Sequence, residues 1–159
     1  MMQSGAHDFD FLFGRWNVTH RRLKQRLSGS SDWEEFHGTS ATRPILGGLG
    51  NIEEHEIHLP SGSYLAIALR SFDLKTGHWA IWWLDQRSPH SLDVPVVGQF
   101  IDGIGIFDAD DVLDGRPIKV RFQWNTRDAD GMPKWQQSFS ADGGGTWEPN
   151  WHMVFSRAN

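Results

Sequence analysis

The sequence predicts an all-β fold, a single antiparallel up-and-down β-barrel of nine or ten strands. Nine Trp and ten Phe stand in a chain of 159 residues, and such large aromatic side chains favour strands and bury much area. The 17 Gly and 7 Pro mark frequent turns. Between these turns, apolar and polar residues alternate with a period of two, which is typical of strands with one buried face. A sheet of such strands avoids exposed edges by closing on itself.

Ten segments show this alternation and are expected to be strands: residues 16–27, 33–42, 51–59, 64–72, 78–84, 96–101, 103–107, 118–124, 134–139 and 151–157. The connections between them are short, so consecutive strands should pair. Segment 6–13 is the one expected helix, because its Phe9, Leu12 and Phe13 fall at helical spacing. We expect it to close one end of the barrel. No linker divides the chain, so residues 1–159 are expected to form one domain.

Net charge and cysteine content argue against several classes of protein. The formal net charge is −5, and Lys and Arg are spread through the chain, so no nucleic-acid partner is expected. The chain has no Cys, which excludes disulfides and thiolate metal sites. No signal-like start and no apolar stretch of about 20 residues occur, so we expect a cytoplasmic protein without a membrane partner. A nucleotide-dependent enzyme is disfavoured because there is no glycine-rich phosphate loop.

The motif Gly14-Arg15-Trp16 follows the expected helix and opens the first expected strand. This placement resembles the Gly-x-Trp signature of the lipocalins, which belong to the calycin barrels. In that family the Trp seals the closed end of the barrel, and an Arg near the end of the last strand packs over it. Arg157 occupies the corresponding place. The resemblance implies a calycin-like barrel with structural roles for Gly14, Trp16 and Arg157.

A wider pattern combines FLFGRW at 11–16, PILGG at 44–48 and WWLD at 82–85. It resembles an uncharacterised bacterial family of lipocalin-like barrels, and this resemblance implies the fold but no activity. More distantly, the chain resembles the nitrobindins, small bacterial calycins whose haem is ligated by a His near the C-terminus. His152 is similar in position and is the candidate haem ligand. Because it alternates with Trp151 and Met153, we expect its side chain to point away from the apolar face.

Residues 140–147 read SADGGGTW and resemble the Asp box of sialidases, which is a structural hairpin turn. In such a turn the carboxylate of Asp142 accepts hydrogen bonds from turn amides, and Trp147 packs beneath it. We therefore expect structural roles for both residues. A second acidic segment, 108–114, offers carboxylates that would suit calcium, but its spacing is not that of an EF-hand. Ordinary turn chemistry is the preferred interpretation, and no metal site is expected.

Two histidines in the first expected hairpin are candidates for function. If the chain turns within residues 27–31, the numbers of paired residues sum to about 57, which places His20 opposite His37 and Arg22 opposite Glu35. The face that begins with Trp16 would then line the cavity with a polar network. A His pair with a carboxylate can bind a metal, and a neutral His can act as a general base. The alternative is a solvated face on which these residues are incidental.

Segment 79–87 is apolar on both faces, so one set of its Trp residues should pack inside the barrel. The other set would meet a covering loop or a second copy of the chain, and an exposed Trp79 or Trp82 would favour a homodimer. Trp83 and Asp85 share a face at the expected open rim, where they are candidates for ligand binding. Three further candidates point either into a polar part of the cavity or outward: Arg70, Arg121 and Gln123.

The sequence favours a binding protein that holds a small apolar or aromatic ligand inside the barrel. The first alternative is a cofactor-free isomerase, cyclase or hydrolase, with His20 or His37 as base and an Arg that stabilises negative charge. The second alternative is haem binding through His152. The leading hypothesis involves no cofactor. Its candidate ligand-binding residues are His20, Arg22, Glu35, His37, Arg70, Trp83, Asp85, Arg121 and Gln123.

Overall fold

Ten antiparallel strands make up most of residues 5–159, the part of the chain that the computed structural model describes. The strands are β1 (Gly14–Leu23), β2 (Trp33–Ile45), β3 (Gly50–Leu59), β4 (Gly62–Asp73), β5 (His78–Asp85), β6 (Val96–Ile101), β7 (Ile104–Leu113), β8 (Arg116–Asn125), β9 (Lys134–Ser140) and β10 (Glu148–Arg157). Two short 3₁₀ turns accompany them, η1 (Asp10–Leu12) before β1 and η2 (Leu46–Gly48) between β2 and β3. No helix within residues 5–159 has the length and apolarity that crossing a membrane requires.

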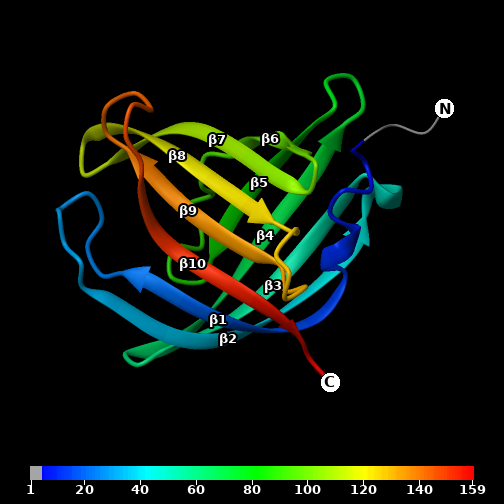
Figure 1. Cartoon of the computed structure of the whole chain (residues 1–159), viewed down its shortest axis with the longest axis horizontal. Helices are drawn as coiled ribbons and strands as arrows, with labels where there is room; N and C mark the ends of the chain where they lie inside the picture. Colours follow the sequence, from blue (N-terminus) through cyan, green and yellow to red (C-terminus); the bar gives the residue numbers. More distant parts are fainter. Residues whose placement is uncertain (1–4) are drawn as a thin grey trace.

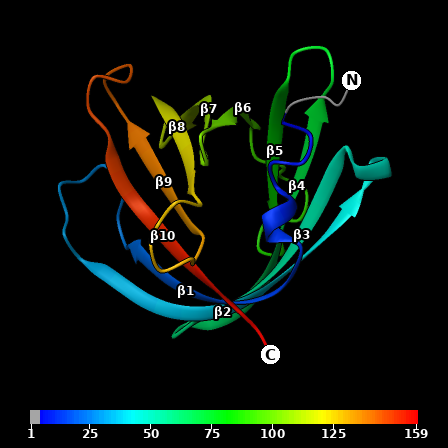
Figure 2. The ribbon, with the colours of Figure 1, turned by 45° about the vertical axis from the view of Figure 1, so that its right-hand side comes forward.

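The strands form one closed sheet in which each strand pairs with its neighbours in the chain, and β1 closes the barrel by pairing with β10 (Figure 1). Figure 2 shows β8, β9 and β10 on one side and β3, β4 and β5 on the other, with β1 and β2 between them. The β5–β6 pairing is short and runs only from Trp79↔Gly98 to Ile81↔Val96. The predicted all-β up-and-down barrel is confirmed, with ten strands.

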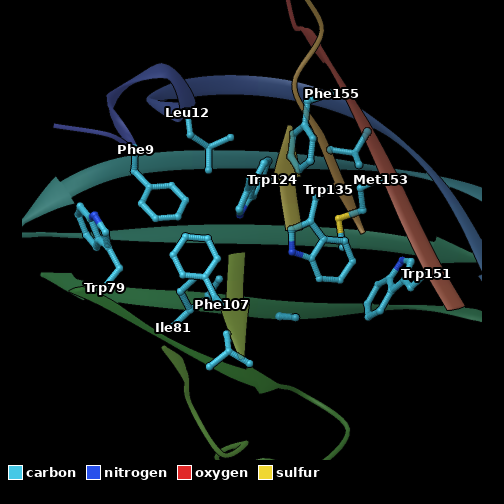
Figure 3. Packing of buried hydrophobic residues seen from close by; sticks show 14 of the residues in the cluster. Phe9, Leu12, Trp79, Ile81, Phe107, Trp124, Trp135, Trp151, Met153 and Phe155 are labelled. Atoms are coloured by element: carbon cyan, nitrogen blue, oxygen red, sulfur yellow. The ribbon is translucent and has the colours of Figure 1, made fainter. Parts of the chain in front are cut away.

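One face of each strand fills the interior of the barrel. On β1, Trp16, Val18 and His20 are buried, whereas the residues between them are exposed. This alternation follows from the pleat of a strand, which points successive side chains to opposite faces. Figure 3 shows large buried side chains along the interior, from Phe9 and Trp79 at one end to Trp151 at the other.

Phe9 fills the end of the barrel at which β1 begins. Its ring centroid lies 4.9 to 6.2 Å from those of Trp79, Phe100, Phe107 and Trp124. The helix expected over 6–13 is shorter than predicted, because this segment forms turns and the three-residue 3₁₀ helix η1 rather than an α-helix. So short a segment cannot offset the cost of nucleating an α-helix, and the 3₁₀ turn already buries its apolar side chains.

Trp16 and Arg157 lie together at this closed end. The Cζ atom of Arg157 is 3.8 Å from the centroid of the Trp16 ring, and Nη1 donates to the main-chain oxygen of Phe13 at 2.6 Å. Trp16 Nε1 donates to the main-chain oxygen of Leu12 at 2.8 Å. Gly14 has a φ of 109°, and a side chain there would collide with Arg157. These contacts tie the first and last strands to the N-terminal segment.

The turn between β9 and β10 is built around Asp142. Its carboxylate accepts hydrogen bonds from the hydroxyl and the amide of Thr146, at 2.7 and 2.8 Å, and from the hydroxyl of Ser140 at 2.8 Å. These hydrogen bonds hold the pKa of Asp142 well below its usual range. Beside the turn, the Cζ atom of Arg121 lies 4.2 Å from the ring centroid of Trp147. The Asp142 side chain therefore fixes the conformation of the hairpin turn.

The β1–β2 hairpin differs from the prediction by one residue. Its last pair is Leu23↔Trp33, so His20 lies opposite Phe36 rather than opposite His37. Because strands have a side-chain period of two, this shift moves the His37 face of β2 from the interior to the outside. The predicted pairing of His20 with His37 is therefore wrong.

Candidate functional site

A cluster of polar side chains lies inside the barrel on β2, β3 and β4. Arg70 Nη1 donates to Asn51 Oδ1 at 2.8 Å, and Nη2 forms an ion pair with Glu53 Oε1. The other carboxylate oxygen of Glu53 accepts from the hydroxyl of Ser40 and lies 3.1 Å from His55 Nε2. All five residues are buried, although their side chains are polar and most of the interior around them is apolar. We call them the polar cluster.

Glu53 is the charged centre of this cluster. Burial acts to raise the pKa of its carboxyl, but the neighbouring charges of His55 and Arg70 and the hydrogen bonds from His55 and Ser40 lower it well below its usual range. The carboxylate is therefore ionised and supplies the counter-charge that the buried guanidinium of Arg70 requires. Removing either partner would leave an uncompensated charge inside the barrel.

His20 lies beside the polar cluster and is completely buried. Its Nδ1 accepts a hydrogen bond from Trp151 Nε1 at 3.1 Å, and its ring stacks on Phe36 with the centroids 4.7 Å apart. Burial, with the nearby positive charges of His55 and Arg22, lowers the pKa of His20 to about 3. His20 is therefore neutral at pH 7, and because Nδ1 accepts, we assign its proton to Nε2.

Several buried polar atoms of the interior have no hydrogen-bond partner among residues 5–159. They are Arg70 Nε, Trp124 Nε1, His55 Nδ1, His20 Nε2 and Thr42 Oγ1. Buried polar groups are almost always paired in folded proteins, so a group of exceptions in one region needs an explanation. Three of the five atoms belong to residues that line one cavity, which we describe next.

Two small cavities lie inside the barrel. The inner cavity has a volume of about 20 Å³, and its wall includes His55, Arg70 and Trp124. The rim cavity lies nearer the opposite end of the barrel, at which β1 ends and which we call the open end, and has a volume of about 70 Å³. Ile81, Trp83 and Phe122 line both cavities, so movement of the two aromatic side chains would join them. Without such movement, the inner cavity has room for one water-sized group, and the rim cavity has room for a few atoms.

Two carboxylates, Asp93 and Asp111, and the amide of Gln137 are the polar groups in the wall of the rim cavity. Burial raises the pKa of Asp93, and the negative charges of Asp111 and Asp85 raise it further. The main-chain amide of Asp93 donates to the oxygen of Trp83 at 3.0 Å, which holds segment 86–95 along β5. This segment therefore covers the side of the barrel at which β5 stops pairing with β6.

A larger hollow of about 680 Å³ lies outside the barrel, on the outer faces of β2 to β5. We call it the external groove. Its wall includes outward-facing side chains of Ala41, Glu54, Leu65, Ile67 and Leu84. The side chains of the polar cluster occupy the opposite side of the same strands. The external groove is larger than the cavities, and of the five residues with unpaired buried atoms only His55 belongs to its wall, whereas Arg70 and Trp124 do not.

Five of the predicted ligand-binding residues point into the barrel: His20, Arg22, Arg70, Trp83 and Asp85. Arg22 lies at the open end, with its Cζ atom 4.9 Å from the ring centroid of Trp151. Arg22 Nη1 contacts the hydroxyl of Tyr64 at 3.4 Å. Asp85 forms an ion pair with Arg87 at 3.1 Å. Arg22, from the predicted ligand-binding face of β1, and Asp85, from the predicted open rim, therefore lie at the same end of the barrel.

The other four predicted residues lie outside. Glu35 is exposed, and its carboxylate is 3.9 Å from Arg21 rather than beside Arg22, so the predicted Arg22–Glu35 pair is wrong. The reason is the same one-residue shift of the hairpin that exposes His37. Arg121 forms an ion pair with Asp108 at 2.8 Å on the outer face of β7 and β8. The remaining residue, Gln123, shares this outer face of β8.

His152 also faces away from the interior. Its ring centroid lies 5.5 Å from that of Trp33 on the outer surface of β10 and β2. Partial burial, with the positive charge of Arg21, lowers the pKa of His152. A haem bound to this imidazole would lie outside the barrel.

Four residues of the interior site were missed by the sequence analysis: Ser40, Asn51, Glu53 and His55. Segment 51–59 does carry a signal, because Glu53 and His55 alternate in phase with the apolar Ile57. The alternation places these side chains on the same face of the strand as Ile57, but it does not say whether this face points into the barrel or toward solvent. Only the pairing of β3 with β4 decides between these two positions. Comparison of the chain with models of protein families and with curated proteins finds no match.

Proposed function

We propose that this protein binds a small apolar or aromatic molecule inside the barrel, between the polar cluster and the open end. The observation that carries the proposal is the inner cavity, where aromatic walls meet buried polar atoms that have no partner among residues 5–159. Ligand sites combine apolar walls with a few polar groups in this way. The arrangement of Gly14, Trp16 and Arg157 supports the resemblance to lipocalin-like barrels.

Trp83 has a central part in this proposal. It separates the inner cavity from the rim cavity and packs against His55 and Trp151, with ring centroids 5.3 and 5.7 Å apart. A ligand larger than a few atoms displaces this indole and Phe122 and so joins the two cavities. Its apolar surface then replaces the aromatic contacts that the displaced rings lose.

The test is a titration of the protein with benzene, toluene and benzaldehyde, followed through the indole N–H signals in nuclear magnetic resonance spectra. We expect saturable shifts for the interior Trp83 and Trp135, and none for Trp33 and Trp147 on the outside. Shifts confined to the outer pair, or no saturable shift with any probe, would overturn the proposal.

A matched pair of variants localises the binding. Ala68 lines the inner cavity, whereas Ala41 lines the external groove. Ala68→Val fills the inner cavity, so it should weaken binding of every probe, and Ala41→Val should leave binding unchanged. Equal effects of the two substitutions would count against an interior site.

A second candidate function, cofactor-free proton transfer, is favoured by one specific contact. The Glu53 carboxylate lies 3.1 Å from His55 Nε2, while His55 Nδ1 has no partner within the described chain. A carboxylate that holds one ring nitrogen leaves the other available as a base. His20 suits this role less, because its pKa is lowered to about 3 and its Nδ1 already accepts from Trp151. His37 lies outside the barrel, as does His152, so we propose neither a base at His37 nor haem binding.

This second function predicts that the protein accelerates exchange of the α-protons of cyclopentanone with D2O. His55→Gln should abolish the acceleration and His37→Gln, on the outer face, should retain it. A rate equal to that of buffer for the native protein would exclude this function and leave the binding proposal intact.

A further inference from the structure

Two hydrogen-bond donors of the inner cavity are unused. Arg70 directs Nη1 to Asn51 and Nη2 to Glu53, which leaves Nε without a partner within residues 5–159. Trp124 Nε1, which also only donates, is a second fully buried nitrogen of the cavity wall without a partner among residues 5–159. Both side chains are about 2 % exposed, so bulk water does not reach them.

The two donors belong to neighbouring groups. The Cζ atom of Arg70 lies 5.6 Å from the ring centroid of Trp124, and both residues line the same cavity. An Arg guanidinium and an indole N–H donate but cannot accept. Leaving such a donor buried and unpaired is costly, so the site favours a group that accepts.

We propose that the interior ligand carries a neutral carbonyl oxygen, which accepts hydrogen bonds from Arg70 Nε and Trp124 Nε1. This inference rests on the proposed binding function and names its ligand class, small apolar ketones and aldehydes. The inner cavity of about 20 Å³ takes the oxygen, and the apolar body occupies the rim cavity beyond Trp83.

Charge selects a neutral acceptor such as a carbonyl oxygen over an ionised group. Glu53 already pairs with Arg70, and a neutral carbonyl oxygen accepts from both free donors without requiring any further counter-charge. An amine would place a positive charge beside Arg70 and could not accept from either donor. A pure hydrocarbon fits the walls but leaves both donors unpaired.

Two molecules of nearly the same shape test the inference, cyclopentanone and methylenecyclopentane, which differ in C=O against C=CH2. We expect the ketone to bind at least about tenfold more tightly, since a site built to donate rejects an analogue that cannot accept. The indole N–H proton of Trp124 should shift downfield with the ketone only. Equal affinities, with no such shift, would overturn the inference while leaving the binding function standing. If neither molecule binds, the binding function itself fails.

Variants separate the hydrogen bond from the packing. Trp124→Phe removes one donor, so the preference for the ketone should fall several-fold while methylenecyclopentane binds about as before. Trp33→Phe is the control, because Trp33 lies on the outer surface of the barrel, with its ring centroid 5.5 Å from that of His152. An equal loss of preference in both variants would contradict the assignment. If Trp124→Phe does not fold, the Trp124 proton shift of the native protein decides between the outcomes.

Discussion

Replacing His20 by Gln should make the stability of this protein less sensitive to acid. His20 is completely buried, and burial with the charges of His55 and Arg22 lowers its pKa to about 3. In the unfolded chain its pKa is the ordinary value of 6.5. Between these two values the unfolded chain binds a proton that the folded protein does not, so stability falls as the pH drops from 6.5 toward 3.

The size of the effect follows from the two pKa values. From pH 7.5 to pH 4.5 the folded imidazole stays neutral while the unfolded one becomes protonated, and each pH unit well below 6.5 costs about 1.4 kcal/mol of unfolding free energy. His20 alone therefore removes about 2.7 kcal/mol over this interval. Gln keeps an oxygen that can accept from Trp151 Nε1, but it does not titrate, so His20→Gln should lose this part of the pH dependence.

Urea unfolding followed by circular dichroism at pH 7.5 and pH 4.5 measures the difference. The native protein should lose about 2.7 kcal/mol more than His20→Gln between the two pH values. His37→Gln is the control, because His37 is exposed on the outer face of β2 and should preserve the native pH dependence. If His20→Gln and the native protein lost the same free energy, His20 would not be neutral in the interior.

Three further predictions concern the closed end, the polar cluster and the Asp142 turn. Phe9→Ala should lower the free energy of unfolding by about 3–5 kcal/mol in urea titrations, because Phe9 is buried among four aromatic rings. A loss below about 1 kcal/mol would show that Phe9 does not fill the closed end. Glu53→Gln leaves Arg70 buried without a counter-charge and should cost about 3–5 kcal/mol at pH 7. Since the pKa of Glu53 is lowered, its stabilisation is present above the ordinary value of 4.5 and is lost as the pH falls further. Equal stability of Glu53→Gln and the native protein at pH 7 would contradict the ion pair. Asp142→Ala should speed amide hydrogen exchange at Thr146 and leave the barrel strands protected, whereas unchanged exchange would refute the role of the carboxylate.

The fold was largely predictable because strand alternation and turn residues are local signals. The register of the first hairpin was not, because it depends on how the loop after β1 folds back. Leu27 in this loop has a φ of 54°, and its amide donates to the side chain of Glu148 on β10 at 2.8 Å. Such a contact between distant parts of the chain leaves no trace in the local pattern. An error of one residue then reversed the face assigned to His37.

The site was predictable in part for a similar reason. His20 was identified because it stands on the face that begins with Trp16, and Trp83 because its segment is apolar on both faces. Arg70 was a candidate because it alternates with apolar neighbours, a pattern that left its direction open. Glu53 and His55 obey the same alternation, but inward charges are stable only when a partner compensates them. That partner, Arg70, comes from β4, so the pair becomes visible only once the two strands are in register.

The central claim, that a small molecule binds inside the barrel, is tested most directly by nuclear Overhauser effects between bound benzaldehyde and assigned side chains. Our account predicts contacts to Phe122 and Met153, which line the inner cavity. Contacts only to Leu65 and Ile67 would place the molecule in the external groove and contradict the account.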